Sequence, residues 1–189
     1  MPTTFTLRPA RTNDLEALRS IYNHAVQHTT ASYDYEPRSA EKHIEWFTAK
    51  NASGYPVIVA EILGESVGFA SYGSFRAWMG YRFTVEHSVY VGEAARRQGI
   101  ASALVRAVID AASAQGLHTM VAGIDAANEG SIALHRKLGF EDAGVLRQVG
   151  FKFDRWLDLA FMTRQLNPLR GPSPQESSEK SRETPMIAS

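Results

Sequence analysis

Hydrophobic and polar positions follow two periods along residues 5–167, and these periods separate helices from strands. Apolar stripes at helical spacing predict helices over about 12–26, 39–47, 98–115 and 131–138. Short β-branched or alternating runs predict strands at 5–8, 56–61, 67–72, 84–91, 120–124, 145–153 and 156–163. Between two of these strands, residues 73–82 are expected to form a loop rich in aromatic and basic side chains.

The order of these elements predicts the fold class. One strand and two helices precede a run of strands, and a strand–helix–strand–helix unit with two final strands follows. We therefore expect a mixed α/β domain of the α+β type over residues 1–167, with a largely antiparallel sheet, flanking helices and one parallel crossover.

The last segment, 168–189, has a different composition. It contains four of the eight prolines, many serines and no aromatic residue. Such a segment buries too little apolar surface to offset the entropy of ordering, so a disordered tail is predicted.

Charge and composition exclude several classes of function. Twenty Lys and Arg balance twenty Asp and Glu, so the net charge is zero and a nucleic-acid partner is not expected. There is no cysteine, which excludes disulfides and Cys-ligated metals. His24 and His28 lack a nearby third ligand, so no metal is expected. No signal peptide or membrane-spanning stretch is apparent, and the predicted location is the cytoplasm, without a membrane partner.

The most informative stretch is 89–101, where a strand runs through a basic, glycine-containing turn into a long helix. The first N–H groups of a helix have no intrahelical partner and favour anions. Gly99 and Ala101 keep the surface low, and Arg96 and Arg97 add positive charge. Neither a nucleotide P-loop nor a dinucleotide fingerprint fits this turn. On spacing alone, an ordinary helix start with surface arginines remains the alternative.

Two landmarks resemble the GNAT superfamily of N-acetyltransferases. Arg96-x-x-Gly99-x-Ala101 matches its coenzyme A signature, and Asn128 followed by Leu138-Gly139-Phe140 resembles its second block. Further segments are similar to the phosphinothricin/methionine sulfoximine acetyltransferase family: 22–23, 30–32, 55–56, 70–73, 84–91, 131–135 and 148–153.

The resemblance implies acetyl-CoA as cosubstrate and a strand bulge near Val89 whose peptide groups bind the cofactor arm. It also implies a homodimer. The cofactor-binding residues expected on this basis are Val89, Tyr90, Val91, Arg96, Arg97, Gln98, Gly99, Ile100, Ala101, Ser102 and Asn128. Asn128 also suits the N-cap of the following helix, and both roles are compatible.

Glu86 is the predicted general base, because direct acetyl transfer requires a group that takes the proton of the amine. Strand alternation places Glu86 and Ser88 on one face and His87 on the other. A glutamate on a solvated strand face is the alternative interpretation. His135 is the predicted acid or proton relay for the departing thiolate, and a packing histidine is its alternative.

A carboxylate-bearing substrate calls for a guanidinium, so Arg76 is predicted to bind it, with Arg82 second. The further substrate-binding residues expected are Ala77, Trp78, Glu86, His87, Ser88 and Tyr33. The aromatic residues around Arg76 also suit a dimer interface.

The resemblance implies an amino-acid N-acetyltransferase that acts on phosphinothricin, methionine sulfoximine or methionine sulfone, with a role in detoxification, as in herbicide resistance. Two alternatives stay open: an acetyltransferase for peptide or protein N-termini, and a non-catalytic CoA-binding regulatory module.

Overall fold

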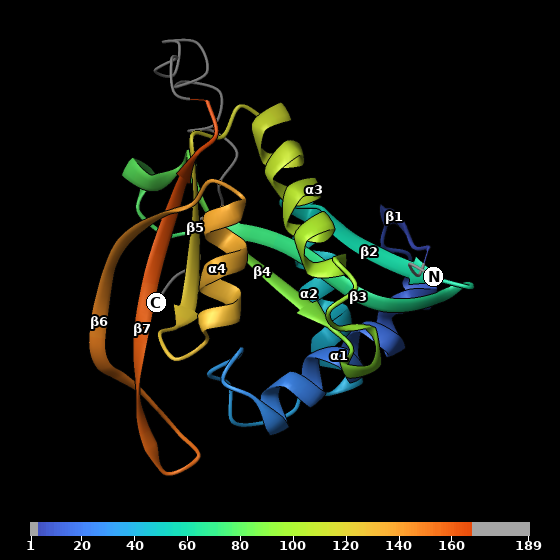
Figure 1. Ribbon diagram of the computed structural model, residues 1–189. Coiled ribbons are helices and arrows are strands. Elements are labelled where there is room, and N and C mark those ends of the chain that lie inside the picture. The colour runs from blue at the N-terminus through green and yellow to red at the C-terminus, as the bar shows by residue number, and fades with distance from the viewer. Residues whose placement is uncertain (1–3, 168–189) are drawn as a thin grey trace.

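The computed structural model describes residues 4–167, so the tail predicted at 168–189 lies outside the described residues. In this part of the chain, seven strands form one sheet with four α-helices against it (Figure 1). The strands are β1 (Thr6–Pro9), β2 (Val57–Ile62), β3 (Glu65–Ser74), β4 (Thr84–Val91), β5 (Thr119–Asp125), β6 (Glu141–Lys152) and β7 (Arg155–Gln165). The helices are α1 (Leu15–His28), α2 (Ala40–Ala52), α3 (Ile100–Ala114) and α4 (Glu129–Lys137), with 3₁₀ turns η1 (Thr12–Asp14), η2 (Met79–Tyr81) and η3 (Glu93–Ala95).

The sheet has the order β1-β2-β3-β4-β5-β7-β6. Every neighbouring pair is antiparallel except β4 and β5, which run parallel and are connected through α3. The predicted mixed sheet with one parallel crossover is thus confirmed. No helix within residues 4–167 has the length and apolar character needed to cross a membrane.

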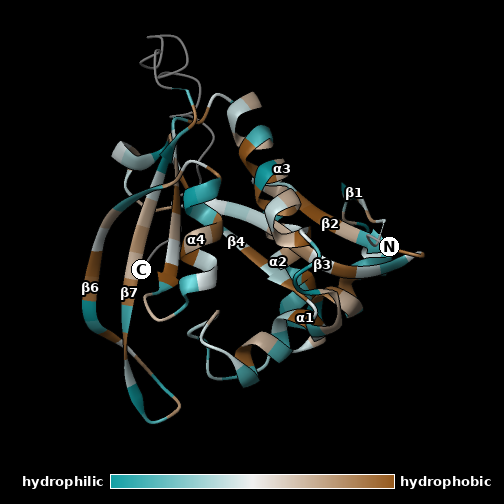
Figure 2. Cartoon of the chain, viewed as in Figure 1, coloured by the Kyte–Doolittle hydropathy of each residue, from teal (hydrophilic) through white to brown (hydrophobic). Residues whose placement is uncertain are grey.

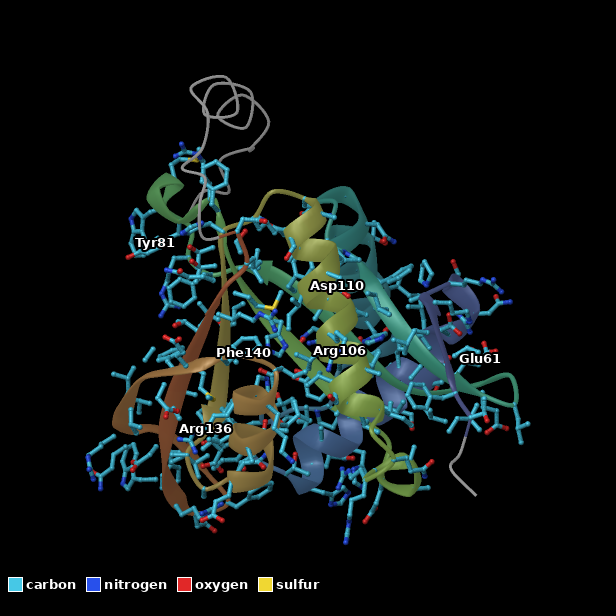
Figure 3. The ribbon with its side chains drawn as sticks, turned by 45° about the horizontal axis from the view of Figure 1, so that its top comes forward. Glu61, Tyr81, Arg106, Asp110, Arg136 and Phe140 are labelled. Carbon is cyan, nitrogen blue, oxygen red and sulfur yellow. The ribbon has the colours of Figure 1, made fainter. Side chains whose placement is uncertain are left out.

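Two apolar layers hold the helices on opposite faces of the sheet. On one face, Leu18 and Val26 of α1 pack with Phe69 of β3. On the other face, α3 packs its apolar stripe, including Leu104, against strand residues such as Val85. Figure 3 shows the polar side of α3 turned outward with Arg106 and Asp110, and Figure 2 shows the hydrophobic colour on the central strands beneath. The helical periodicity of the sequence therefore marks the buried sides correctly.

The sheet opens at its centre, between the two parallel strands. β4 and β5 pair only over Thr84–Glu86 and Thr119–Val121, although both strands continue beyond these residues. β4 keeps its pairing with β3 as far as Val91, and β5 keeps its pairing with β7 as far as Asp125. The result is a split flanked by continuous sheet on both sides, which we call the β4–β5 split.

The bulge predicted near Val89 is wrong for the β3–β4 pair. The register runs without a shift from Ser74↔Val85 to Gly68↔Val91. Early termination of the β4–β5 pairing separates these strands, and this event depends on the tertiary path of β5. The resemblance predicts the irregularity within β4, whereas the structure has it between β4 and β5.

Several element boundaries also differ from those predicted. β3 extends to Ser74, into the expected loop, and β6 starts at Glu141, four residues before its predicted start. The β6–β7 turn uses Phe153 and Asp154 with φ of 52° and 55°. Non-glycine residues seldom adopt this conformation, so the sequence carries little sign of the tight turn.

Replacing His43 with phenylalanine tests the packing of α2. His43 is buried against Trp46, and neither ring nitrogen has a hydrogen-bond partner among the described residues. We expect an unchanged or higher Tm at pH 7, because a buried unsatisfied polar group costs about 1–3 kcal/mol.

The same substitution has a defined pH dependence. Burial lowers the pKa of His43 from 6.5 to about 4. Between pH 6.5 and about pH 4 the unfolded chain therefore binds more protons than the folded chain. His43 thus lowers the free energy of unfolding progressively as the pH falls below 6.5. His43→Phe should lose less Tm than the wild type between pH 7 and pH 5. Equal losses in thermal melts at both pH values contradict this account.

Candidate active site

Two cavities meet in the β4–β5 split. One, of about 490 Å³, is lined by Glu86 and Gly123, and we call it the Glu86 cavity. The other, of about 450 Å³, lies at the start of α3, and we call it the α3 cavity. They share the lining residues Thr30, Ala31, Val89, Tyr90, Asn128, Ser131 and His135. A group held in one cavity therefore reaches the other along this common wall.

The α3 cavity has the features of an anion site. Gly99 is the N-cap of α3 with φ of +82°, a left-handed conformation that glycine adopts without strain. No side chain caps this helix, and its first turn carries no acidic residue. Arg96 and Arg97 line the same cavity. The free N–H groups, the helix dipole and two guanidinium groups thus favour phosphate.

Most of the predicted cofactor-binding residues come together here. The lining includes Val89, Tyr90, Val91, Arg96, Arg97, Gly99, Ile100, Ala101, Ser102 and Asn128. Gln98 is not part of it, because its side-chain amide donates to the Ala94 carbonyl oxygen. The structure adds Thr29–Ala31, from the connection between α1 and α2, and no local motif there indicated a binding site.

Backbone groups of β4 face into the split. The bonds from Gly92 N to Val67 O and from Phe75 N to Thr84 O bracket the β3–β4 ladder. In an antiparallel ladder, alternate residues point their peptide groups at the partner strand. Counting from these bonds, Val89 and Val91 point away from β3, on the side where β5 no longer pairs. Their N–H and C=O groups are therefore positioned to bind a ligand in the split.

Glu86 lies at the last position of β4 that pairs with β5, and two glycines make room around it. A Cβ on Gly123 of β5 would stand 2.8 Å from Glu86 Oε1, so the carboxylate lies directly over this glycine. On the other side, Gly73 of β3 is the register partner of Glu86. Burial raises the pKa of Glu86, and the charge of Arg76 opposes this shift. A raised carboxyl pKa makes the carboxylate a better proton acceptor.

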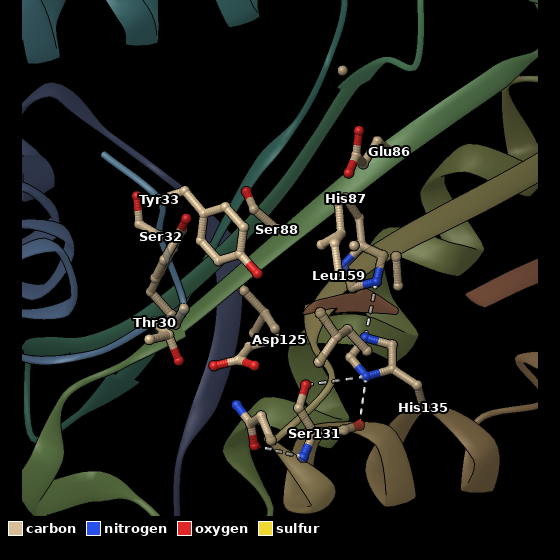
Figure 4. Close-up of a pocket in the computed structure, with 18 of the residues that line it drawn as sticks. Thr30, Ser32, Tyr33, Glu86, His87, Ser88, Asp125, Ser131, His135 and Leu159 are labelled. Carbon is tan, nitrogen blue, oxygen red and sulfur yellow. Dashed lines mark hydrogen bonds between the residues drawn. The ribbon is translucent and has the colours of Figure 1, made fainter. Parts of the chain in front are cut away.

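His87 and His135 form a buried pair on the opposite side of β4 from Glu86, as alternation predicts (Figure 4). The Nε2 atoms are 3.0 Å apart, and His135 Nδ1 lies 2.7 Å from the Ser131 carbonyl oxygen. Since a carbonyl only accepts, Nδ1 of His135 carries hydrogen, and in the neutral pair His87 Nε2 donates to His135 Nε2.

Burial keeps this pair neutral. It lowers the pKa of His87 to about 3, with a further contribution from His135, and it lowers the pKa of His135 as well. His87 Nδ1 is buried without a partner among the described residues. The pair is thus a rigid, uncharged wall of the Glu86 cavity at neutral pH.

The other predicted substrate residues divide into two groups. Tyr33 and Ser88 line the Glu86 cavity together with Glu86 and His87. Tyr33 needs Gly150, because a Cβ there would be 2.5 Å from its ring. Arg76, Ala77 and Trp78 are exposed and do not line either cavity.

Arg76 stacks on the Phe75 ring and donates to the Phe75 carbonyl oxygen. Sequence reasoning missed Lys50 and Asp125, which do line the Glu86 cavity. Asn128 accepts from Ser131 N and so caps α4, as expected.

The resemblance implies an acetyl-CoA site built from a strand, a basic turn and a helix start, and the α3 cavity contains these three parts. Comparison with known families agrees: the profile of the acetyltransferase (GNAT) family matches residues 15–140. The chain belongs to this family, and it is an acetyltransferase by fold and by similarity.

Three relatives show which acetyltransferases the chain resembles in sequence and in structure. The chain is 48% identical over 165 residues to an L-methionine sulfoximine/L-methionine sulfone acetyltransferase of Pseudomonas paraeruginosa, covering 87% of this chain and 96% of that one. A phosphinothricin acetyltransferase from Sinorhizobium meliloti, crystallised with AcCoA, superposes with a TM-score of 0.84 at 39% identity, covering 90% and 96%. A ribosomal-protein-alanine N-acetyltransferase from Brucella melitensis superposes with a TM-score of 0.84 at 46% identity, covering 85% and 99%.

Replacing Gly123 with alanine tests the placement of Glu86. The added methyl group would stand 2.8 Å from Glu86 Oε1, so the carboxylate must move while the backbone stays in place. We expect a loss of roughly tenfold to a hundredfold in kcat/KM, because small displacements of a reacting group have large effects.

Gly80→Ala is the matched control, since nothing described lies within 4 Å of its Cβ. It should leave kcat/KM and Tm unchanged. A Gly123→Ala enzyme with wild-type kcat/KM contradicts the importance of the Glu86 position.

Proposed function

We propose that the chain transfers the acetyl group of acetyl-CoA to the α-amino group of a small L-amino-acid analogue of the methionine sulfoximine or methionine sulfone type. The observation that carries this proposal is the Glu86 cavity, where the Glu86 carboxylate lies in the lining and which joins the α3 cavity along a shared wall. Its size is that of a small-molecule site. The names of the relatives agree with amino-acid analogues, including phosphinothricin.

The residues of the α3 cavity fit acetyl-CoA, which supplies the acetyl thioester when it is bound. The first-turn N–H groups of α3, Arg96 and Arg97 suit its pyrophosphate. The peptide groups of Val89 and Val91 suit the amide groups of its pantetheine arm. The structure of the Sinorhizobium meliloti relative in complex with AcCoA supports this assignment.

In this proposal the transfer is direct, without an acyl-enzyme. Glu86 removes the proton of the substrate ammonium, and the free amine attacks the carbonyl carbon of the thioester. The Val89 N–H stabilises the oxyanion that forms. The chain contains no cysteine that could serve as a covalent carrier.

His135 is proposed to take part in protonating the leaving thiolate. In the neutral pair, Nε2 of His135 accepts from His87, so the pair has no proton to give until it takes one up. Its source is the second proton of the attacking nitrogen, which that nitrogen must lose as the amide forms and the C–S bond breaks. His135 therefore acts as a relay rather than as a permanently charged acid.

A second substrate class is favoured by one observation. The Brucella melitensis relative is named a ribosomal-protein-alanine N-acetyltransferase. The free amino group of a protein N-terminus presents the same chemistry to Glu86. A panel of amino-acid and peptide acceptors distinguishes the two substrate classes. With the leading substrate class we also propose a cytoplasmic location and a role in detoxification, as in herbicide resistance.

We also propose a homodimer. The β6–β7 hairpin forms one edge of the sheet and projects beyond it (Figure 1). The large hydrophobic side chains that this hairpin exposes are Val145, Leu146, Val149, Phe151, Phe153 and Trp156. Phe153 lies in the turn between the two strands. An exposed edge strand with such side chains is suited to an interface.

Replacing Glu86 with glutamine tests the reaction and the base together. With methionine sulfoximine, methionine sulfone, phosphinothricin, a polyamine and a short peptide as acceptors, we expect CoA release with the amino-acid analogues. The variant should lose about 10²- to 10⁴-fold in kcat, the usual contribution of a general base. Release with the peptide alone overturns the substrate class, and acetyl-CoA binding without release supports a binding module.

Replacing Val149 with glutamate tests the dimer. A charge in an apolar interface is costly, so the variant should sediment as a monomer where the wild type sediments as a dimer. Leu63→Glu is the matched control, since Leu63 is fully exposed on the β2–β3 turn. A monomeric wild type, or a dimer that persists in Val149→Glu, contradicts the proposed interface.

A further inference from the structure

Lys50 of α2 is a partly buried ammonium group in the wall of the Glu86 cavity. Its Nζ donates to the Tyr72 carbonyl oxygen at 2.7 Å. It stands above Gly73, where a Cβ would be 2.8 Å from Nζ. No other described atom lies within 4 Å of that Cβ position. The absence of a side chain at residue 73 is therefore what admits the ammonium group to the cavity.

This cation has no counter-ion within the protein. Lys50 forms no ion pair with any described Asp or Glu. One of its three N–H donors is used by Tyr72, and burial lowers the pKa of Lys50 to about 8. Buried charges are normally paired, because desolvation without a partner is costly. A ligand that brings a negative charge into the cavity would complete this group.

The position of Lys50 relative to Glu86 fits a zwitterion. Gly73 and Glu86 are register partners on adjacent strands, so their Cβ directions share one face of the sheet. The Lys50 ammonium lies over Gly73 on this face, and the Glu86 carboxylate leans the other way, over Gly123. The cavity thus presents a cation and an anion side by side with space between them.

We infer that Lys50 binds the α-carboxylate of the amino acid whose α-amino group Glu86 deprotonates. This inference rests on the proposed function and adds a substrate-binding residue to it. Lys50 thereby selects amino acids over simple amines and fixes the α-amino group toward Glu86.

The other cations near the cavity are less suited to this role. Arg76 is exposed, lines neither cavity and stacks on Phe75. Lys152 is buried, but its ammonium group already donates to the Thr29 and Ser32 carbonyl oxygens. Lys50 combines a place in the lining with unused donors.

The test compares two acceptors that differ in one group: methionine sulfoximine and the amine that lacks only its carboxylate. For Lys50→Met we expect KM for methionine sulfoximine to rise about tenfold or more, the usual effect of losing a charge-assisted hydrogen bond. Its KM for acetyl-CoA should stay near wild type, and its kcat with methionine sulfoximine should not rise. For the decarboxylated amine, KM should stay the same or fall. Lys42→Met, which replaces an exposed lysine of the same helix, should change KM for neither acceptor.

Equal losses for the two acceptors in Lys50→Met show a structural role and overturn the inference. If Lys50→Met does not fold, Gly73→Ala decides, since its methyl group displaces Nζ and should raise KM for methionine sulfoximine selectively. Absence of wild-type turnover with either acceptor is a different outcome, because it rejects the proposed function on which the inference rests.

Discussion

The early end of the pairing between β4 and β5 is the constraint on which the site depends. Only three register pairs join these strands, whereas β4 stays fully paired with β3 and β5 with β7. A sheet normally satisfies its own backbone groups, so an internal split leaves N–H and C=O groups that need partners. Here the unpaired groups include those of Val89, in the wall that the two cavities share, and of Val91, in the α3 cavity. The binding capacity of the site is thus a consequence of incomplete pairing.

The two outer halves of the sheet keep this opening rigid. α3 and α1 pack on opposite faces, and their buried stripes anchor β4 from both sides. Glu86 is the last residue of β4 that pairs with β5, so its backbone is held although its carboxylate faces open space. Glycines at 73 and 123 remove the side chains that would otherwise fill that space. Packing is given up at two positions, and a half-buried carboxylate and a neighbouring ammonium group take their place.

The parts of the fold and site that depend on local signals could be predicted from the sequence. The α3 stripe, the basic, glycine-containing turn before it and the opposite facing of Glu86 and His87 follow from periodicity and turn chemistry. Lys50 could not be found this way, because it reaches the cavity from a helix distant in sequence. Arg76 is predicted from its residue type beside an aromatic loop, and the position of that loop outside both cavities is set by the fold. The Phe153–Asp154 turn lacks the usual glycine and is visible only in the fold.

The split also separates two chemical tasks across the thickness of the sheet. Glu86 and Lys50 lie on the face of α1 and α2, and they present charges. The His87–His135 pair lies on the face of α3 and α4, and burial keeps it neutral. A charged pair there would compete with Lys50 for an anionic substrate and would repel an ammonium group. A neutral histidine wall leaves the orientation of the substrate to the charged groups on the other face. Charge on one face and neutrality on the other together favour a single pose, with the amino group directed at the shared wall.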